Sequence, residues 1–140
     1  MKSATYAKTM LFLGLAGLLF SGYLSAVKLF SSTCAFNEPC PYLWGWPACW
    51  YGFGMFLIIF IAALWGLLRE NARRKLTKVI ALVSAAGIVF AGYFTLPEMN
   101  NLFSGAATGY TLLLPTCAYG LIFYVLIFVL SFRYVRNRPN

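Results

Sequence analysis

Residues 79–97 read VIALVSAAGIVFAGYFTLP, a run of nineteen residues without a charged side chain. A helix that crosses the hydrocarbon core of a bilayer needs about 20 apolar residues, because each residue advances it by about 1.5 Å. Three more uncharged runs occur at 9–27, 39–68 and 99–132. The first of these fits one helix, and the other two have room for one helix preceded by a loop. The sequence therefore predicts four membrane-spanning helices.

The expected fold is an all-α membrane protein, built as a four-transmembrane-helix bundle. A soluble domain carries about a quarter charged residues, whereas this chain is 10% charged and 61% hydrophobic. It has too few polar side chains to cover a water-soluble globule, and residues 1–140 form a single transmembrane domain. The expected helices are 8–28, 48–68, 78–96 and 112–132, and the expected outer loops are 29–47 and 97–111.

The basic residues predict the orientation of the bundle. Ten of the eleven cations fall on one side of a four-pass chain, and the positive-inside rule assigns that side, with both termini, to the cytoplasm. Lys28 is the exception, and its long side chain can reach the outer interface. This distribution argues against nucleic acid as the reason for the net charge of +8 and predicts contacts with membrane lipids. The ten cations are Lys2, Lys8, Arg69, Arg73, Arg74, Lys75, Lys78, Arg133, Arg136 and Arg138.

The second half of the chain repeats the first. Residues 18–25 read LLFSGYLS and residues 88–95 read IVFAGYFT, while 47–52 read PACWYG and 115–120 read PTCAYG. The two offsets are 70 and 68 positions. Apolar helices resemble one another by composition alone, but two matched motifs in the same order favour a duplicated helical hairpin. Because each hairpin begins inside, we expect parallel repeats related by a pseudo-two-fold axis along the membrane normal.

All four cysteines map to the outer face or to the outer ends of helices, at Cys34, Cys40, Cys49 and Cys117. Of the three connectivities that four cysteines allow, sequence position favours a loop pair, Cys34–Cys40, and a pair between the repeats, Cys49–Cys117. No metal site is expected, because the spacings fit no Cys-x-x-Cys pattern and the chain has no histidine. Structural disulfides, a redox relay between the two pairs and free buried thiols remain open.

Prolines mark the outer starts of the second and fourth helices. Pro47 and Pro115 suit the first helical position, where the missing N–H costs nothing. Cys49 and Cys117 are then expected in the first turn of their helices, beside free backbone amides and the positive end of the helix dipole.

These motifs resemble the vitamin K epoxide reductase family over most of the chain. Residues 21–25 are similar to its Ser-x-Tyr-Leu segment, and 45–47 to the Gly-Ile-Pro segment that opens its second helix. Cys34 and Cys40 match its outer-loop pair, with the spacing of bacterial members. Residues 117–120 stand in the place of its helix-4 Cys-x-x-Cys motif, but a glycine replaces the second cysteine. The chain thus resembles a divergent member with an incomplete motif.

The resemblance implies a membrane thiol–disulfide oxidoreductase that passes electrons to a quinone of the menaquinone, ubiquinone or vitamin K type. It implies that Cys34 and Cys40 exchange with an extracytoplasmic thiol, such as a thioredoxin-like protein, and that Cys49 replaces the lost partner of Cys117. Tyr124 takes the place of the quinone-contacting tyrosine. The alternative is a non-enzymatic four-helix scaffold or subunit, in which structural disulfides hold the outer loops.

Aromatic side chains crowd the outer helix ends. We expect Trp50, Tyr51 and Tyr119 to join Tyr124 in contacting the quinone. The tryptophans at 44, 46 and 50 fit either an interfacial aromatic belt or the mouth of an apolar ligand pocket. No acid or base lies deep within a predicted span, so an ion-coupled transporter lacks its usual residues.

Overall fold

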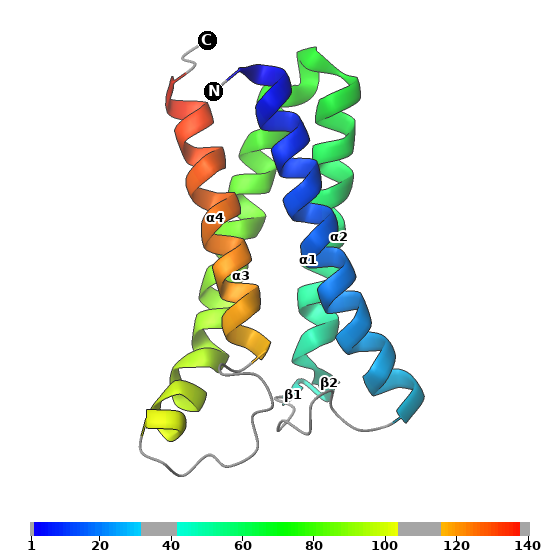
Figure 1. The fold of residues 1–140 in the computed structure, drawn as a ribbon, viewed down its shortest axis with the longest axis vertical. Coiled ribbons are helices and arrows are strands. Elements are labelled where there is room, and N and C mark those ends of the chain that lie inside the picture. The colour runs from blue at the N-terminus through cyan, green and yellow to red at the C-terminus, as the bar shows by residue number, and fades with distance from the viewer. Residues whose placement is uncertain (1, 32–41, 104–115, 138–140) are drawn as a thin grey trace.

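Four antiparallel helices form an up-and-down bundle in the computed structural model, with the N- and C-terminal ends at the same end of the molecule (Figure 1). All four helices are long and apolar enough to cross a membrane, which confirms the predicted all-α bundle of a multi-pass membrane protein. The structure describes residues 2–31, 42–103 and 116–137. Its elements are α1 (Ser3–Ser31), β1 (Tyr42–Leu43), β2 (Trp46–Pro47), α2 (Ala48–Leu68), α3 (Glu70–Phe103) and α4 (Thr116–Asn137).

The helix bounds match the prediction for α2 and differ elsewhere. The basic link expected between the second and third helices is itself helical, and only Arg69 separates α2 from α3. Arg69 is extended, with φ −123° and ψ 96°, and its N–H donates to the Trp65 carbonyl at 2.8 Å. α1 is longer than expected at both ends, and α4 continues to Asn137, beyond its predicted end at 132. The predicted start of the fourth helix at 112 lies outside the described residues.

α3 also continues past its predicted end at residue 96, through Pro97 to Phe103. A proline inside a helix removes one backbone hydrogen bond and crowds the preceding turn. Pro97 is exposed, as are Tyr93 and Leu96 in the preceding turn. The proline therefore lies on the outer side of α3, and the helix continues through it.

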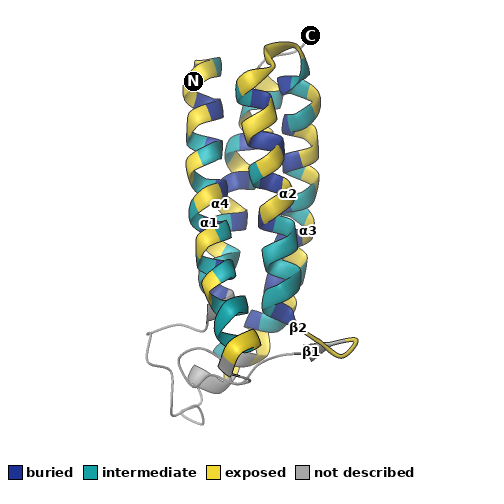
Figure 2. Cartoon of the chain, turned by 90° about the vertical axis from the view of Figure 1, so that its right-hand side faces the viewer, coloured by how far each residue is buried: buried dark blue, intermediate teal, exposed yellow. Residues whose placement is uncertain are grey.

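Neighbouring helices pack in the ring order α1–α2–α3–α4, and the α1–α4 seam is the least extensive of the four. α2 and α4 therefore stand at opposite corners. Buried residues face the bundle axis and exposed residues face outward in Figure 2. Leu19, Leu82, Val89 and Phe132 are each more than half exposed. Such an apolar exterior suits lipid, which is as apolar as these side chains.

Two stacked aromatic rings fill the centre of the bundle, and each faces a glycine. The rings of Phe56 on α2 and Tyr124 on α4 have centroids 4.4 Å apart and planes inclined by 11°. A Cβ added at Gly17 of α1 would lie 2.3 Å from the Phe56 ring, and one added at Gly87 of α3 would lie 2.5 Å from the Tyr124 ring. The glycines therefore let α1 and α3 close around the two rings.

This central layer follows the offsets of the sequence repeats. Gly17 and Gly87 are 70 positions apart, and Phe56 and Tyr124 are 68 apart. The α1–α2 pair and the α3–α4 pair thus make the same glycine–aromatic contact. We call them the first and second hairpins.

A second set of contacts has the same symmetry. Phe20 of α1 packs against Tyr119 of α4, with ring centroids 6.2 Å apart. The equivalent residues, Phe90 of α3 and Tyr51 of α2, pack with centroids 5.7 Å apart. The predicted pseudo-two-fold relation between parallel hairpins therefore holds in the packing as well as in the sequence.

A buried arginine closes the end of the bundle that carries the chain termini. Arg73 on α3 is 5% exposed. Its guanidinium donates to the carbonyls of Gly66 at 2.7 Å and Leu67 at 3.4 Å, and it lies 3.5 Å from the carboxylate of Glu70. The last carbonyls of a helix have no partner within the helix. Arg73 supplies partners for two of them in α2.

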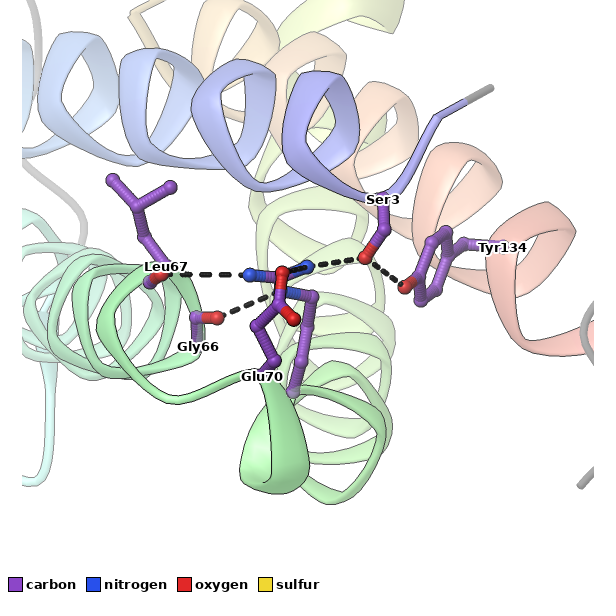
Figure 3. A network of polar contacts seen from close by, with 6 residues as sticks. Ser3, Gly66, Leu67, Glu70 and Tyr134 are labelled. Carbon is purple, nitrogen blue, oxygen red and sulfur yellow. Dashed lines mark hydrogen bonds and ion pairs between the residues drawn. The ribbon is translucent and has the colours of Figure 1, made fainter.

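The same arginine reaches the other two helices through hydroxyl groups. Arg73 donates to the Ser3 hydroxyl on α1, which lies 2.9 Å from the hydroxyl of Tyr134 on α4 (Figure 3). The ring of Tyr6 stacks on Tyr134 at 4.0 Å, and its hydroxyl lies 3.0 Å from that of Ser131. A polar network therefore joins α1 to α4 at this end.

We expect alanine at Gly17 or Gly87 to lower the free energy of unfolding by about 1–3 kcal/mol, because the new methyl group overlaps a buried ring. The measurement is unfolding in mixed micelles, followed by circular dichroism. Gly54→Ala and Gly92→Ala are matched controls, since a Cβ there meets nothing within 4 Å. Phe56→Leu should recover part of the loss in the Gly17→Ala protein. Similar losses at all four glycines would contradict the proposed layer.

Replacing Arg73 by glutamine is expected to cost about 1–3 kcal/mol, because buried carbonyl groups of α2 lose their donor. Lys75→Gln, at an exposed position of the same helix, should change stability by no more than about 0.5 kcal/mol. The same unfolding experiment compares the two variants. Equal stability of both proteins would show that the network contributes nothing.

Candidate functional site

The end of the bundle opposite the termini carries the predicted site residues. α2 and α4 both begin there, and Cys49 and Cys117 lie in their first turns. Cys34, Cys40 and the side chain of Cys117 lie outside the described residues. The predicted pair Cys34–Cys40 therefore remains a prediction. The predicted Cys49–Cys117 disulfide is not formed in this structure, in which Cys49 is a free thiol.

Cys49 is a half-buried free thiol. The hydroxyl of Ser25 on α1 donates to the backbone carbonyl of Cys49 at 3.3 Å. Lys28 follows Ser25 by three residues, almost one turn further along α1. The last turns of α1 thus lie against the start of α2.

The helix starts differ in one respect from the prediction. Pro47 is the N-cap of α2, with φ −61° and ψ 141°, and it belongs to β2 instead of the first helical turn. No side chain caps α2. α4 begins at Thr116, and Pro115 lies outside the described residues. Cys49 and Cys117 are therefore each the second residue of their helix, among backbone amides that have no partner within the helix.

A short hairpin precedes α2 and carries two of the outer tryptophans. Trp44 and Gly45 form its two-residue turn, with φ 52° and 81°. Two positive φ values are the requirement of a type I′ turn. Trp44 is 86% exposed and Trp46, which is 54% exposed, packs on Trp50 at 5.0 Å. This exposure favours the interfacial belt over the mouth of a pocket.

Helical periodicity places the two first-turn cysteines on facing stripes. Cys49 precedes Phe56 by seven residues, which is about two turns, so both occupy one stripe of α2. Position 117 has the same relation to Tyr124 on α4. Because Phe56 and Tyr124 stack across the axis, the cysteine positions lie on the helix faces that look toward each other, about 10 Å closer to the loop end.

The four aromatic residues predicted to contact a quinone occupy different places in the described part of the bundle. Tyr124 is buried at the centre, where its hydroxyl donates to the Gly52 carbonyl at 3.2 Å. Tyr51 lies in the α2–α3 seam and Tyr119 in the opposite α1–α4 seam. Trp50 packs on the hairpin that precedes α2. The structure thus brings Tyr124 within one turn of Cys49 and separates the other three.

A small cavity lies at the other end of the bundle. Tyr6, Met10, Arg73 and Thr77 are among the residues that line it. It is large enough for about one water molecule. This cavity is therefore too small for a quinone ring and belongs to the polar network around Arg73.

The hydroxyl group of Ser25 has no role in the sequence-based prediction, although it donates to the Cys49 carbonyl. Thr95 occupies the equivalent sequence position in the second hairpin, 70 residues later. The repeats 18–25 and 88–95 both end in a hydroxyl residue, which was the available signal. The sequence alone did not indicate that Ser25 lies against the start of α2.

Comparison of the chain with known protein families, curated proteins and solved structures finds no match. The resemblance to vitamin K epoxide reductases is therefore untested by relatives. The function has to be argued from the residues themselves.

Tyr124→Phe keeps the aromatic stack and removes one hydrogen bond, so we expect it to cost about 0.5–1.5 kcal/mol of unfolding free energy. Tyr124→Ala also leaves a void between Gly87 and Phe56 and should cost about 3–5 kcal/mol. Tyr93→Phe, at a position that is 71% exposed, is the control and should have little effect. If Tyr124→Phe is as unstable as Tyr124→Ala, the hydroxyl and not the ring holds this layer together.

Proposed function

We propose that the chain is a membrane thiol–disulfide oxidoreductase of the vitamin K epoxide reductase type. Its four cysteines, Cys34, Cys40, Cys49 and Cys117, pass electrons from an extracytoplasmic thiol to a quinone. The observation that carries the proposal is the equivalent placement of Cys49 and position 117. Both lie in the first turn of a helix, at the same end of the bundle, on stripes that face each other across the axis.

The reaction consists of thiol–disulfide exchanges followed by quinone reduction. A substrate dithiol attacks the Cys34–Cys40 disulfide and leaves as a disulfide, so the loop pair gains two electrons and two protons. One loop thiolate then attacks the Cys49–Cys117 disulfide, and the second loop thiol resolves the mixed disulfide. The reduced pair gives two electrons and two protons to the quinone, which becomes a quinol while the Cys49–Cys117 bond forms again.

The pair of helix cysteines has to meet across the bundle axis, because α2 and α4 occupy opposite corners. A disulfide requires Cα atoms within about 7 Å. Gly52 and Gly120 follow the two cysteines by three residues and lie on the same stripes. A Cβ at Gly52 would meet only the Tyr124 hydroxyl at 3.8 Å, and one at Gly120 would meet nothing within 4 Å. Neither glycine therefore places side-chain atoms between the two helix starts.

Each end of the bundle then lies on a defined side of the membrane. The terminus end carries the basic residues and faces the cytoplasm, where anionic headgroups bind it. The cysteine end faces the outer compartment, which is oxidising and supplies the thiol partner, a thioredoxin-like protein. Both termini lie at one end of the bundle, as an even number of spans requires (Figure 1).

The test uses purified protein in nanodiscs, with reduced thioredoxin as the thiol donor and menadione as the quinone probe. We expect quinone reduction, followed by absorbance, to depend on the protein. Cys49→Ser and Cys117→Ser should lower the rate to that of empty nanodiscs, because the helix disulfide no longer forms. Thr116→Ser, beside Cys117, is the matched control and should retain activity.

A wild-type rate equal to that of Cys117→Ser would overturn the proposal and leave the non-enzymatic scaffold. Mass mapping of disulfides in graded glutathione buffers separates the two functions independently. Two bonds that both resist mild reduction indicate a structural brace. Mixed bonds that join Cys34 or Cys40 to Cys49 or Cys117 indicate the relay.

A further inference from the structure

The tip of the β-hairpin that precedes α2 combines an exposed side chain with an unfavourable backbone conformation. Trp44 is exposed and has φ 52°, and Gly45 follows with φ 81°. Glycine and asparagine adopt such positive φ values readily, whereas large side chains do so at a cost in free energy. A residue that is held in an unfavourable conformation is a reason to look for its function. The backbone at Trp44 therefore points to a role of the indole outside the β-hairpin itself.

The β-hairpin projects sideways from the bundle and not along its axis. In Figure 2 it leaves the loop end of α2, and its exposed tip lies outside the outline of the helices. A tip that pointed along the axis would enter the water beyond the membrane. A tip that points sideways lies over the lipids that surround a membrane-spanning bundle. The direction of the β-hairpin thus places Trp44 beside the bilayer.

The level of the β-hairpin follows from the packing of α2 against α3. Tyr51 of α2 packs on Phe90 of α3, with ring centroids 5.7 Å apart. Because the two helices are antiparallel and rise equally per residue, the start of α2 at Ala48 lies opposite about residue 93 of α3. Tyr93 and Leu96 are both exposed. The β-hairpin therefore leaves α2 at a level where the outside of α3 is still aromatic and apolar.

The exposed indoles of the β-hairpin continue the lipid-facing surface of the bundle at this level. Trp46 is more than half exposed and packs on Trp50 in the first turn of α2, with ring centroids 5.0 Å apart. Tryptophan is enriched at the boundary between acyl chains and headgroups, because its ring is apolar and its N–H donates to polar groups. The side chain type, the direction and the level all fit that boundary.

We propose that the β-hairpin with Trp44 at its tip is a membrane anchor, and that its partner is the headgroup boundary of the leaflet at the loop end. The contact between Trp46 and Trp50 ties the anchor to α2, so the first turn of this helix stays at the boundary. A water-soluble protein is the other class of partner for an exposed aromatic tip, but a sideways tip at this level meets lipid first. The anchor does not depend on the proposed thiol chemistry.

Fluorescence quenching in nanodiscs tests the anchor. A protein with Trp46→Phe, Trp50→Phe and Trp65→Phe keeps Trp44 as its only tryptophan. The nanodiscs contain phosphatidylcholine with or without bromine atoms on the upper part of the acyl chains, and bromine quenches an indole on contact. Brominated lipid should lower the emission of Trp44 strongly, whereas iodide in the water should have little effect. A protein that keeps only Trp65, an exposed residue of the α2 span, is the control for an indole in contact with lipid.

A second comparison leaves the other three tryptophans in place. Trp44→Asn should retain the turn, because asparagine tolerates a positive φ, and should therefore keep the circular dichroism of the native protein. The difference in emission between the native protein and Trp44→Asn belongs to Trp44, and brominated lipid should remove most of this difference. Strong quenching by iodide without quenching by brominated lipid would overturn the proposal and leave a water-soluble protein as the partner. Quenching by neither would also overturn it, because the indole would then be covered by the chain itself.

Discussion

The stack of Phe56 on Tyr124 sets the spacing of the whole bundle. The two rings come from helices at opposite corners, so they hold α2 and α4 apart and fill the axis between them. α1 and α3 can close over this layer only because Gly17 and Gly87 have no side chain to meet the rings. In a membrane, where apolar burial does not drive helices together, such close packing supplies much of the association. The other contacts of the core follow from this layer.

The two ends of the bundle have different chemistry on either side of that layer. At the terminus end, Arg73 and its partners join all four helices through buried polar contacts. At the cysteine end, a Cβ at Gly52 would meet only the Tyr124 hydroxyl, and one at Gly120 would meet nothing within 4 Å. The polar contacts that join all four helices are thus concentrated at the terminus end.

The lengths of the uncharged runs predicted the bundle, because lipid imposes the same length and polarity on every span. α2 was predicted to the residue, since a proline and a run of charges bound it. The bounds of α3 were not, because the uncharged run 79–97 measures the apolar span, whereas the helix continues through charged residues on both sides of it. For the site, the motifs located Cys49 and Cys117 in their first turns. They could not predict that Tyr51 and Tyr119 face different seams, or that Ser25 reaches Cys49, because both depend on helix rotation about the axis.

Only Arg69 joins the first hairpin to the second, and this short connection bears on how the fold arose. The two hairpins make equivalent contacts, and the ends of the chain meet at the seam opposite this link, where Ser3 and Tyr134 share a hydrogen bond. A chain reopened at the link and joined at its old ends, in the order α3–α4–α1–α2, would keep every core contact. The fold is therefore that of a covalently fused dimer, and one ancestral hairpin gene that was copied once accounts for its origin. The two copies differ at Arg73, because the equivalent position in the first hairpin is Ser3, and the two residues now contact each other.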